Sequence, residues 1–212
     1  MLYFLLHDAG RFRDVIVPPL AAAWRRRSFA PCAALAEALA PAVRRFAEAY
    51  HIADEPLLPR VAGLPFDRAA WRLLAGEVLL CAADEIPELQ TAPDALCLLL
   101  APERYHEGPA SRERLAPVEQ AHFGSRDVAF GPAVYRPDHA GLNDAADVAR
   151  LADYLAAVDE GRWAAADLAG LRDVDPEDLP EELEYVREWF PALRELYEGA
   201  RRRGQVVVCE TL

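Results

Sequence analysis

The sequence predicts an α+β fold that is predominantly helical, with a small sheet that includes the N- and C-terminal strands. Apolar residues recur at helical spacing through most of the chain, and apolar runs of strand length lie at its two ends, Leu2–His7 and Gln205–Cys209. The hydrophobic fraction of 53% exceeds the usual globular range, and much of it is alanine, the best helix former. The 212 residues suit a single domain over 1–212, with a candidate subdomain boundary in the proline-rich stretch near 51–66.

The first half of the chain carries one expected strand followed by helices. Leu2–His7 is short, apolar and closed by a turn signal, which is typical of a buried strand. Helical spacing follows, but Pro18-Pro19 interrupts it, so the first helix is expected to begin near Pro19. Asp67 is a suitable N-cap for a later helix. Apolar spacing predicts helices over 31–50, 67–81 and 93–100, although Leu96–Leu100 alone could be a buried strand.

The C-terminal helix and strand are the best-specified part of the sequence. Helical spacing over Leu179–Arg203 ends at three arginines and Gly204, which together make a strong stop signal. Pro191 is expected to kink this helix or split it. The β-branched run Gln205–Cys209 is then expected to pair with the N-terminal strand or with a strand near Val128. A preceding helix is predicted from Asn143 or Asp144 to Gly161.

The stretch Glu103–Asn143 is rich in His, Gly, Pro and Arg and has little periodicity. A loop of this length inside a compact domain is either functional or contains a missed element. Asp127–Phe130 has the length and residue types of a short strand.

Charge and cysteine usage exclude several classes of function. The net charge of -12 argues against a protein that binds a nucleic-acid backbone. No window approaches the length of a membrane span, and the first residues do not resemble a signal peptide. The four cysteines are widely spaced in apolar surroundings, so we expect buried free thiols and a cytoplasmic protein. No glycine-rich phosphate loop is present, so no cofactor is predicted.

The second half of the chain resembles a known family. Gly124–Tyr135 reads G-S-R-D-V-A-F-G-P-A-V-Y and resembles the G-x-x-D-[LV]-x-[YF]-G-P-A-x-Y segment of the YfbM-like family of bacterial proteins. The resemblance continues through Ala146–Val158 and ends with Trp189–Tyr197, Ala200 and Gly204, so it covers about residues 123–212, while the first half does not align. The function of that family is uncharacterised, so the resemblance implies a shared scaffold and carries over no catalytic residue.

Residues 104–139 carry the side chains best suited to chemistry. Three histidines lie there with carboxylates and arginines, a set that could ligate a metal or act in acid–base catalysis. Their spacing fits no motif, and the same residues could simply hydrogen-bond an irregular backbone. The candidate catalytic residues are His106, His122, Asp127, Tyr135 and His139, and the three histidines are the candidate metal ligands.

An acidic stretch, Asp173–Glu188, leads into the C-terminal helix and contains only one arginine, Arg187. Acidic residues complement the dipole at a helix N-terminus, which explains the pattern structurally. The same residues could form a docking face for a basic protein partner. The favoured hypothesis is therefore a non-enzymatic protein-interaction module with an acidic helical face. The alternative is a small-molecule or metal-dependent enzyme that uses 104–139.

Overall fold

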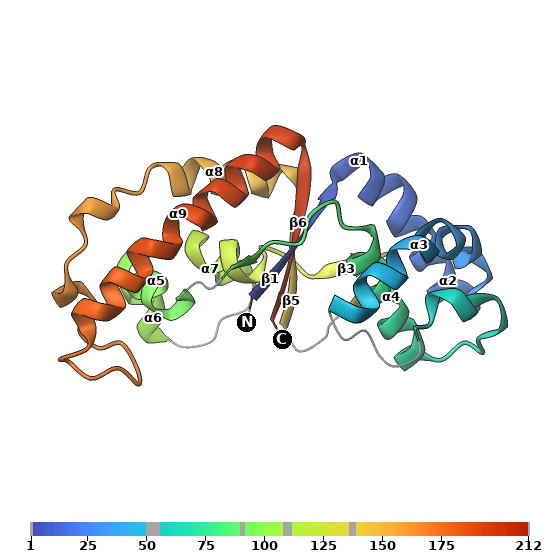
Figure 1. Ribbon diagram of the computed structural model, residues 1–212, viewed down its shortest axis with the longest axis horizontal. Helices are drawn as coiled ribbons and strands as arrows, with labels where there is room; N and C mark the ends of the chain where they lie inside the picture. The colour runs from blue at the N-terminus through green and yellow to red at the C-terminus, as the bar shows by residue number, and fades with distance from the viewer. Residues whose placement is uncertain (1, 50–55, 90–91, 108–111, 136–138, 212) are drawn as a thin grey trace.

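A four-stranded sheet lies between two groups of helices (Figure 1). The computed structural model describes residues 2–49, 56–89, 92–107, 112–135 and 139–211. All neighbouring strands are antiparallel, in the order β2-β1-β6-β5. The strands are β2 (Glu88–Leu89), β1 (Leu2–Asp8), β6 (Gln205–Thr211) and β5 (His139–Asn143). The predicted α+β class is confirmed. The N- and C-terminal strands pair directly, which is one of the two pairings expected from the sequence.

The central strands β1 and β6 are apolar on both faces. Their register places Leu5 opposite Val208 and Leu6 opposite Val207. Leu5 and Val208 belong to the core on one face of the sheet, which we call the first core. Leu6 and Val207 belong to the core on the other face, which we call the second core. Because helices cover both faces, these strands have continuous apolar sequences instead of alternating ones.

Helices of the first half of the chain cover one face of the sheet, on the right in Figure 1. Trp71 lies at the centre of this layer, where its indole N–H donates to the carbonyl of Leu20 at 3.1 Å. The hairpin of β3 (Val128–Phe130) and β4 (Ala133–Tyr135) packs on the same side. The helices of this layer are α1 (Ala9–Arg11), α2 (Val17–Arg26), α3 (Ala33–Ala49) and α4 (Arg68–Ala82), with short 3-10 turns at Ala30–Cys32 and Leu58–Gly63.

The first helix begins at Ala9, so the prediction of a start near Pro19 is wrong. Asp8 is the N-cap of α1, because its carboxylate accepts a hydrogen bond from the backbone N–H of Arg11 at 2.7 Å. A π-helical turn, Phe12–Ile16, then joins α1 to α2. Pro18 and Pro19 lack the N–H groups that would continue regular α-helical bonding to the preceding turn. The wider turn accommodates this loss without ending the helix.

The helices that follow residue 92 cover the opposite face, on the left in Figure 1. Two of them, α6 (Pro102–Glu107) and α7 (Pro117–Phe123), occupy parts of the stretch 103–143 for which little periodicity is seen in the sequence, so that stretch contains missed elements. The short strand expected at 127–130 is present as β3. The helices of this layer are α5 (Pro93–Leu100), α6 (Pro102–Glu107), α7 (Pro117–Phe123), α8 (Ala145–Ala156) and α9 (Leu179–Arg203), with 3-10 turns at Arg112–Arg114, Glu160–Arg162 and Ala165–Leu168.

The helix α9 runs unbroken through Pro191, so the predicted split does not occur. Burial of Phe190 and Leu193 on either side of the proline holds the two halves against the same core. This packing offsets the cost of a proline inside a helix, about 3 kcal/mol. The predicted stop is confirmed, since Gly204 adopts a left-handed conformation with φ 63° directly before β6.

The candidate boundary near 51–66 lies partly outside the described residues, because 50–55 are not among them. The part that is described contains the 3-10 turn Leu58–Gly63, with Leu58 buried in the first core. Glu77 of α4 accepts hydrogen bonds from the N–H of Leu57 at 2.8 Å and from that of Leu58 at 2.9 Å. This carboxylate therefore fixes the segment against α4.

Candidate functional site

The three candidate histidines lie in different environments. His106 is exposed on α6. His122 is buried in α7, where its Nδ1 bonds to the carbonyl of Val118 at 2.8 Å and its Nε2 has no partner among the described residues. Burial lowers the pKa of His122 to about 4, so its ring is neutral near pH 7. The backbone of His139 lies in β5, and its side chain is outside the described part.

Asp127 directly precedes β3, and Tyr135 is the last residue of β4. Their side chains have different partners. Asp127 accepts a hydrogen bond from Nε of Arg112 at 2.8 Å. Tyr135 is buried and hydrogen-bonds to Glu210 of β6; burial, reinforced by that carboxylate, raises the pKa of Tyr135. Within the described ranges, no group of three or more His, Cys, Asp or Glu side chains is placed to hold a metal ion. The structure therefore gives each of these two residues its own ion-pair or hydrogen-bond partner.

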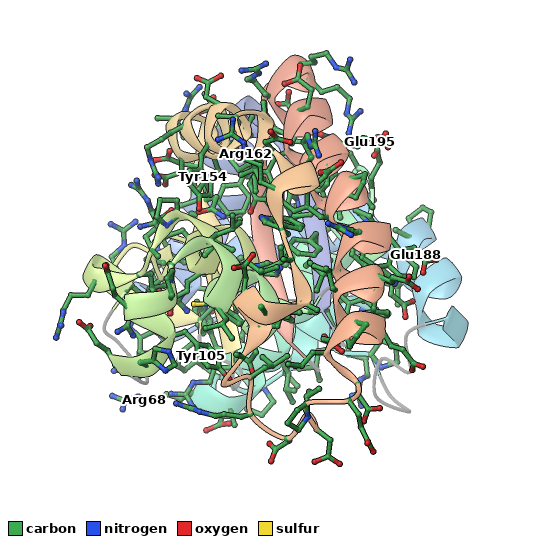
Figure 2. The ribbon with its side chains drawn as sticks, turned by 90° about the vertical axis from the view of Figure 1, so that its left-hand side faces the viewer. Arg68, Tyr105, Tyr154, Arg162, Glu188 and Glu195 are labelled. Carbon is green, nitrogen blue, oxygen red and sulfur yellow. The ribbon has the colours of Figure 1, made fainter. Side chains whose placement is uncertain are left out.

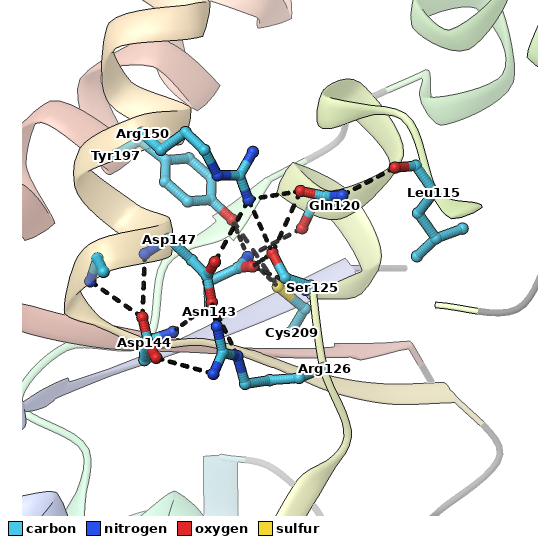
Figure 3. Close-up of polar contacts among 11 residues, drawn as sticks. Leu115, Gln120, Ser125, Arg126, Asn143, Asp144, Asp147, Arg150, Tyr197 and Cys209 are labelled. Atoms are coloured by element: carbon cyan, nitrogen blue, oxygen red, sulfur yellow. Dashed lines mark hydrogen bonds and ion pairs between the residues drawn. The ribbon is translucent and has the colours of Figure 1, made fainter. Parts of the chain in front are cut away.

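A polar network joins Ser125 and Arg126, which follow α7, to β5, α8 and α9 (Figure 3). Asn143, the last residue of β5, is buried and lies at the centre of this network. Its Oδ1 accepts from the hydroxyl of Ser125 at 2.6 Å and from the N–H of Ser125 at 2.8 Å. Its Nδ2 donates to the hydroxyl of Tyr197 at 2.8 Å and to the carbonyl of Gln120 at 2.9 Å. One amide thus ties α7, β5 and α9 together.

Ion pairs close the outer side of this network. Arg126 pairs with Asp147 at 2.7 Å and with Asp144 at 3.0 Å. Asp144 also caps α8 by accepting from two backbone N–H groups, as the sequence predicted. Cys209 is a free buried thiol whose pKa burial raises to about 12, so it stays protonated. The hydroxyl of Ser125 lies 2.6 Å from Oδ1 of Asn143 and 3.4 Å from Oε1 of Gln120, and it accepts a hydrogen bond from the guanidinium of Arg150 at 3.3 Å. These contacts hold Ser125 within the network.

The acidic stretch forms the loop before α9 and its first turns. Two residues with positive φ, Gly170 at 99° and Asp173 at 59°, turn the loop. Leu171 is buried and Val174 packs on the second core, so two apolar anchors hold the loop down. We call its carboxylates the acidic surface: Asp173, Asp175, Glu177, Asp178, Glu181, Glu182, Glu184 and Glu188.

The acidic surface lacks charge compensation. Among the residues that the structure describes, none of its eight carboxylates takes part in an ion pair. Elsewhere exposed acids commonly pair with arginine, as Asp153 does with Arg201 at 2.6 Å. Arg187, the arginine within the stretch, donates instead to the carbonyl of Trp163. Glu188 projects from α9 toward solvent in Figure 2. The negative charges of the acidic surface are therefore exposed to solvent and are not neutralised by ion pairs with described residues.

A pocket of about 380 Å³ opens beside this surface. Its walls come from the start of α5, the end of α7, the anchored loop and the first two turns of α9. Asp94 and Glu182 contribute carboxylates, Arg172 contributes a guanidinium and Tyr185 contributes a ring. The apolar lining consists of Ala92, Pro93, Ala95, Phe123, Leu171 and Val174.

The pocket was not predicted from the sequence. Of the stretch 104–139, only Phe123 lines it, and none of the five candidate catalytic residues does. The sequence signal that could have pointed to it is the aromatic pair Tyr185 and Trp189, spaced by one helical turn at the end of the acidic stretch. Their rings lie 6.3 Å apart on α9.

Comparisons with family models, curated proteins and solved structures find no match for this chain. The resemblance of residues 123–212 to the YfbM-like family thus stays a prediction. Over the described segments, no helix combines the length and apolar character needed to cross a membrane.

Proposed function

We propose that this protein is a non-enzymatic interaction module that binds a basic protein partner through the acidic surface. The observation that carries the proposal is the lack of ion pairs for eight neighbouring carboxylates within the described part of the chain, in a molecule whose other acids are commonly paired. Unpaired charges of one sign attract an oppositely charged partner and speed its association.

Helix stabilisation explains only part of this surface. Glu181 and Glu182 lie in the first turn of α9, where acidic side chains complement the helix dipole. That effect fades within one turn, whereas Glu184 and Glu188 lie beyond it and remain exposed. The carboxylates past the first turn therefore favour docking over helix stabilisation.

The alternative, a small-molecule or metal-dependent enzyme that uses 104–139, draws less support from the geometry. Acid–base catalysis needs a titratable group that can reach a substrate. His122 is buried and bonded to its own helix, and Asp127 is paired with Arg112. The described pocket is lined by neither residue.

A charge-removal experiment tests the proposed function. Glu181, Glu184 and Glu188 lie on one face of α9 and are exposed. Their replacement by glutamine in one variant should weaken binding of an arginine- and lysine-rich peptide about tenfold, if each charge contributes several tenths of a kcal/mol. Isothermal titration calorimetry at physiological salt measures the affinity.

A matched control removes the same number of charges elsewhere. Asp14, Glu85 and Asp153 are exposed and paired with Arg13, Arg203 and Arg201, respectively. Their joint replacement by the corresponding amides gives the same net charge as the test variant. Equal affinities of the two variants for the peptide would contradict a docking role for the acidic surface.

A further inference from the structure

We propose that the pocket beside the acidic surface receives one arginine side chain of the basic partner. This inference rests on the proposed function and names the group that the surface recognises. It follows from the size of the pocket, its apolar walls, the placement of its charges and its aromatic rim.

The size of the pocket suits a single side chain. Its volume of about 380 Å³ is near the lower end of the range for small-ligand sites, roughly 300–1,000 Å³. Ala95 and Leu171 belong to the second core, and Phe123 and Val174 pack against that core. These apolar walls can cover the hydrocarbon stem of a long side chain while its charged end stays near polar groups.

The charges of the pocket favour a cation. Asp94 and Glu182 both line it, and no described residue forms an ion pair with either of them. Arg172, the one cation in the lining, is held by Tyr105: its guanidinium lies 5.2 Å from the ring centroid, and its backbone N–H donates to the hydroxyl of Tyr105 at 2.9 Å. Two carboxylates are thus left for an incoming positive charge.

The aromatic rim favours arginine over lysine. Tyr185 lines the pocket and contacts Trp189 at 6.3 Å between ring centroids. A guanidinium stacks on aromatic rings and bonds to carboxylates through a planar fork. The ammonium of lysine is a compact, strongly hydrated point charge that gains less from such a site.

An anionic ligand fits this site less well. The N-terminus of α5 begins at Pro93 and contributes a weak positive potential to the pocket. Asp94, in the first turn of α5, offsets that potential, and the surrounding acidic surface repels an anion. An acidic peptide is therefore a suitable negative probe.

Peptide binding to the full chain tests the inference. The probes are capped peptides of equal length in which glycine alternates with arginine, with lysine or with aspartate. We expect the wild-type protein to bind the arginine peptide about tenfold more tightly than the lysine peptide, as one charge-assisted hydrogen bond and one cation–π contact would give. The aspartate peptide should not bind.

Two glutamate variants separate the pocket from the rest of the surface. Glu182→Gln should remove most of the preference for the arginine peptide over the lysine peptide. Glu188→Gln, which lies outside the pocket, should lower the affinity for both basic peptides by the same factor. Tyr185→Leu should lower the affinity for the arginine peptide more than that for the lysine peptide. Thermal unfolding of each variant tests whether the fold is retained.

The outcomes are distinguishable. Equal affinities of the wild-type protein for the arginine and lysine peptides would overturn the pocket inference and leave the acidic surface as the docking site. Binding of neither basic peptide would overturn the proposed function, and the inference with it. Binding of the aspartate peptide would assign the pocket to anions and overturn the inference alone.

Discussion

Gly141 determines how closely the end of α7 approaches β5. It lies in the middle of β5, opposite Cys209 of β6. A Cβ at this position would overlap the carbonyl of Phe123 and crowd the guanidinium of Arg112. The close approach lets Arg112 donate to the carbonyls of Phe123, Gly124 and Ala140 at once. A residue without a side chain is therefore required there.

Gly141→Ala should lower the free energy of unfolding by about 1–3 kcal/mol, the usual cost of forcing an extra group into a packed site. Gly63→Ala is the matched control, because no described atom lies within 4 Å of the added Cβ, and its effect should stay within about 0.5 kcal/mol. Urea denaturation of both variants measures the difference. Equal stabilities of the two variants would refute the close approach of α7 and β5.

Residue type alone did not reveal which polar side chains are accessible. His122 and His106 look alike in the sequence as candidate ligands, yet the first is buried in α7 and the second is exposed on α6. The difference arises because Val118 and Ala121, near His122 in α7, pack into the second core. Burial is a property of the fold, and the spacing of these histidines gave no indication of it.

At the scale of elements, the sequence predicted those with strong local signals. Asp67 and Asp144 cap α4 and α8 as expected, and Gly204 ends α9. These signals are local hydrogen bonds and a permissive φ, which a short stretch of sequence can encode. The missed elements lack such signals: β5 contains Gly141 and is a strand because it pairs with β6.

The candidate binding pocket is also a property of several elements together. Asp94, Phe123, Arg172 and Glu182 come from α5, α7, the loop and α9. The sequence indicated the acidic stretch but could not bring Asp94 and Phe123 to it. Only the packing of these elements around the second core places them at one site.

At the scale of the whole molecule, two buried histidines link folding to pH. His7 lies in β1 and is fully buried. Burial lowers the pKa of His7 to about 4, against an opposing effect of Asp84, and burial lowers that of His122 to a similar value. The folded state therefore binds fewer protons than the unfolded state below pH 6.5.

Stability should consequently be full above pH 6.5 and should fall as the pH decreases toward 4. Each histidine should account for a loss on the order of 2–3 kcal/mol over that range. Denaturant unfolding of the wild type, His7→Gln and His122→Gln across this range measures the slope. Glu77 and Glu210, whose pKa values burial raises, act in the opposite direction but are retained in every variant. Equal slopes in all three proteins would contradict the prediction.

The net charge of -12 belongs to the whole molecule, whereas the acidic surface gathers eight neighbouring carboxylates that form no ion pair among the described residues. Long-range attraction between exposed charges acts on the association rate and is screened by salt. The most direct measurement is the association rate constant of a basic peptide at increasing ionic strength. We predict a steep fall for the wild type and for the control with Asp14, Glu85 and Asp153 replaced, and a much weaker dependence after replacement of Glu181, Glu184 and Glu188. The same salt dependence in all three proteins would contradict the docking role of the acidic surface.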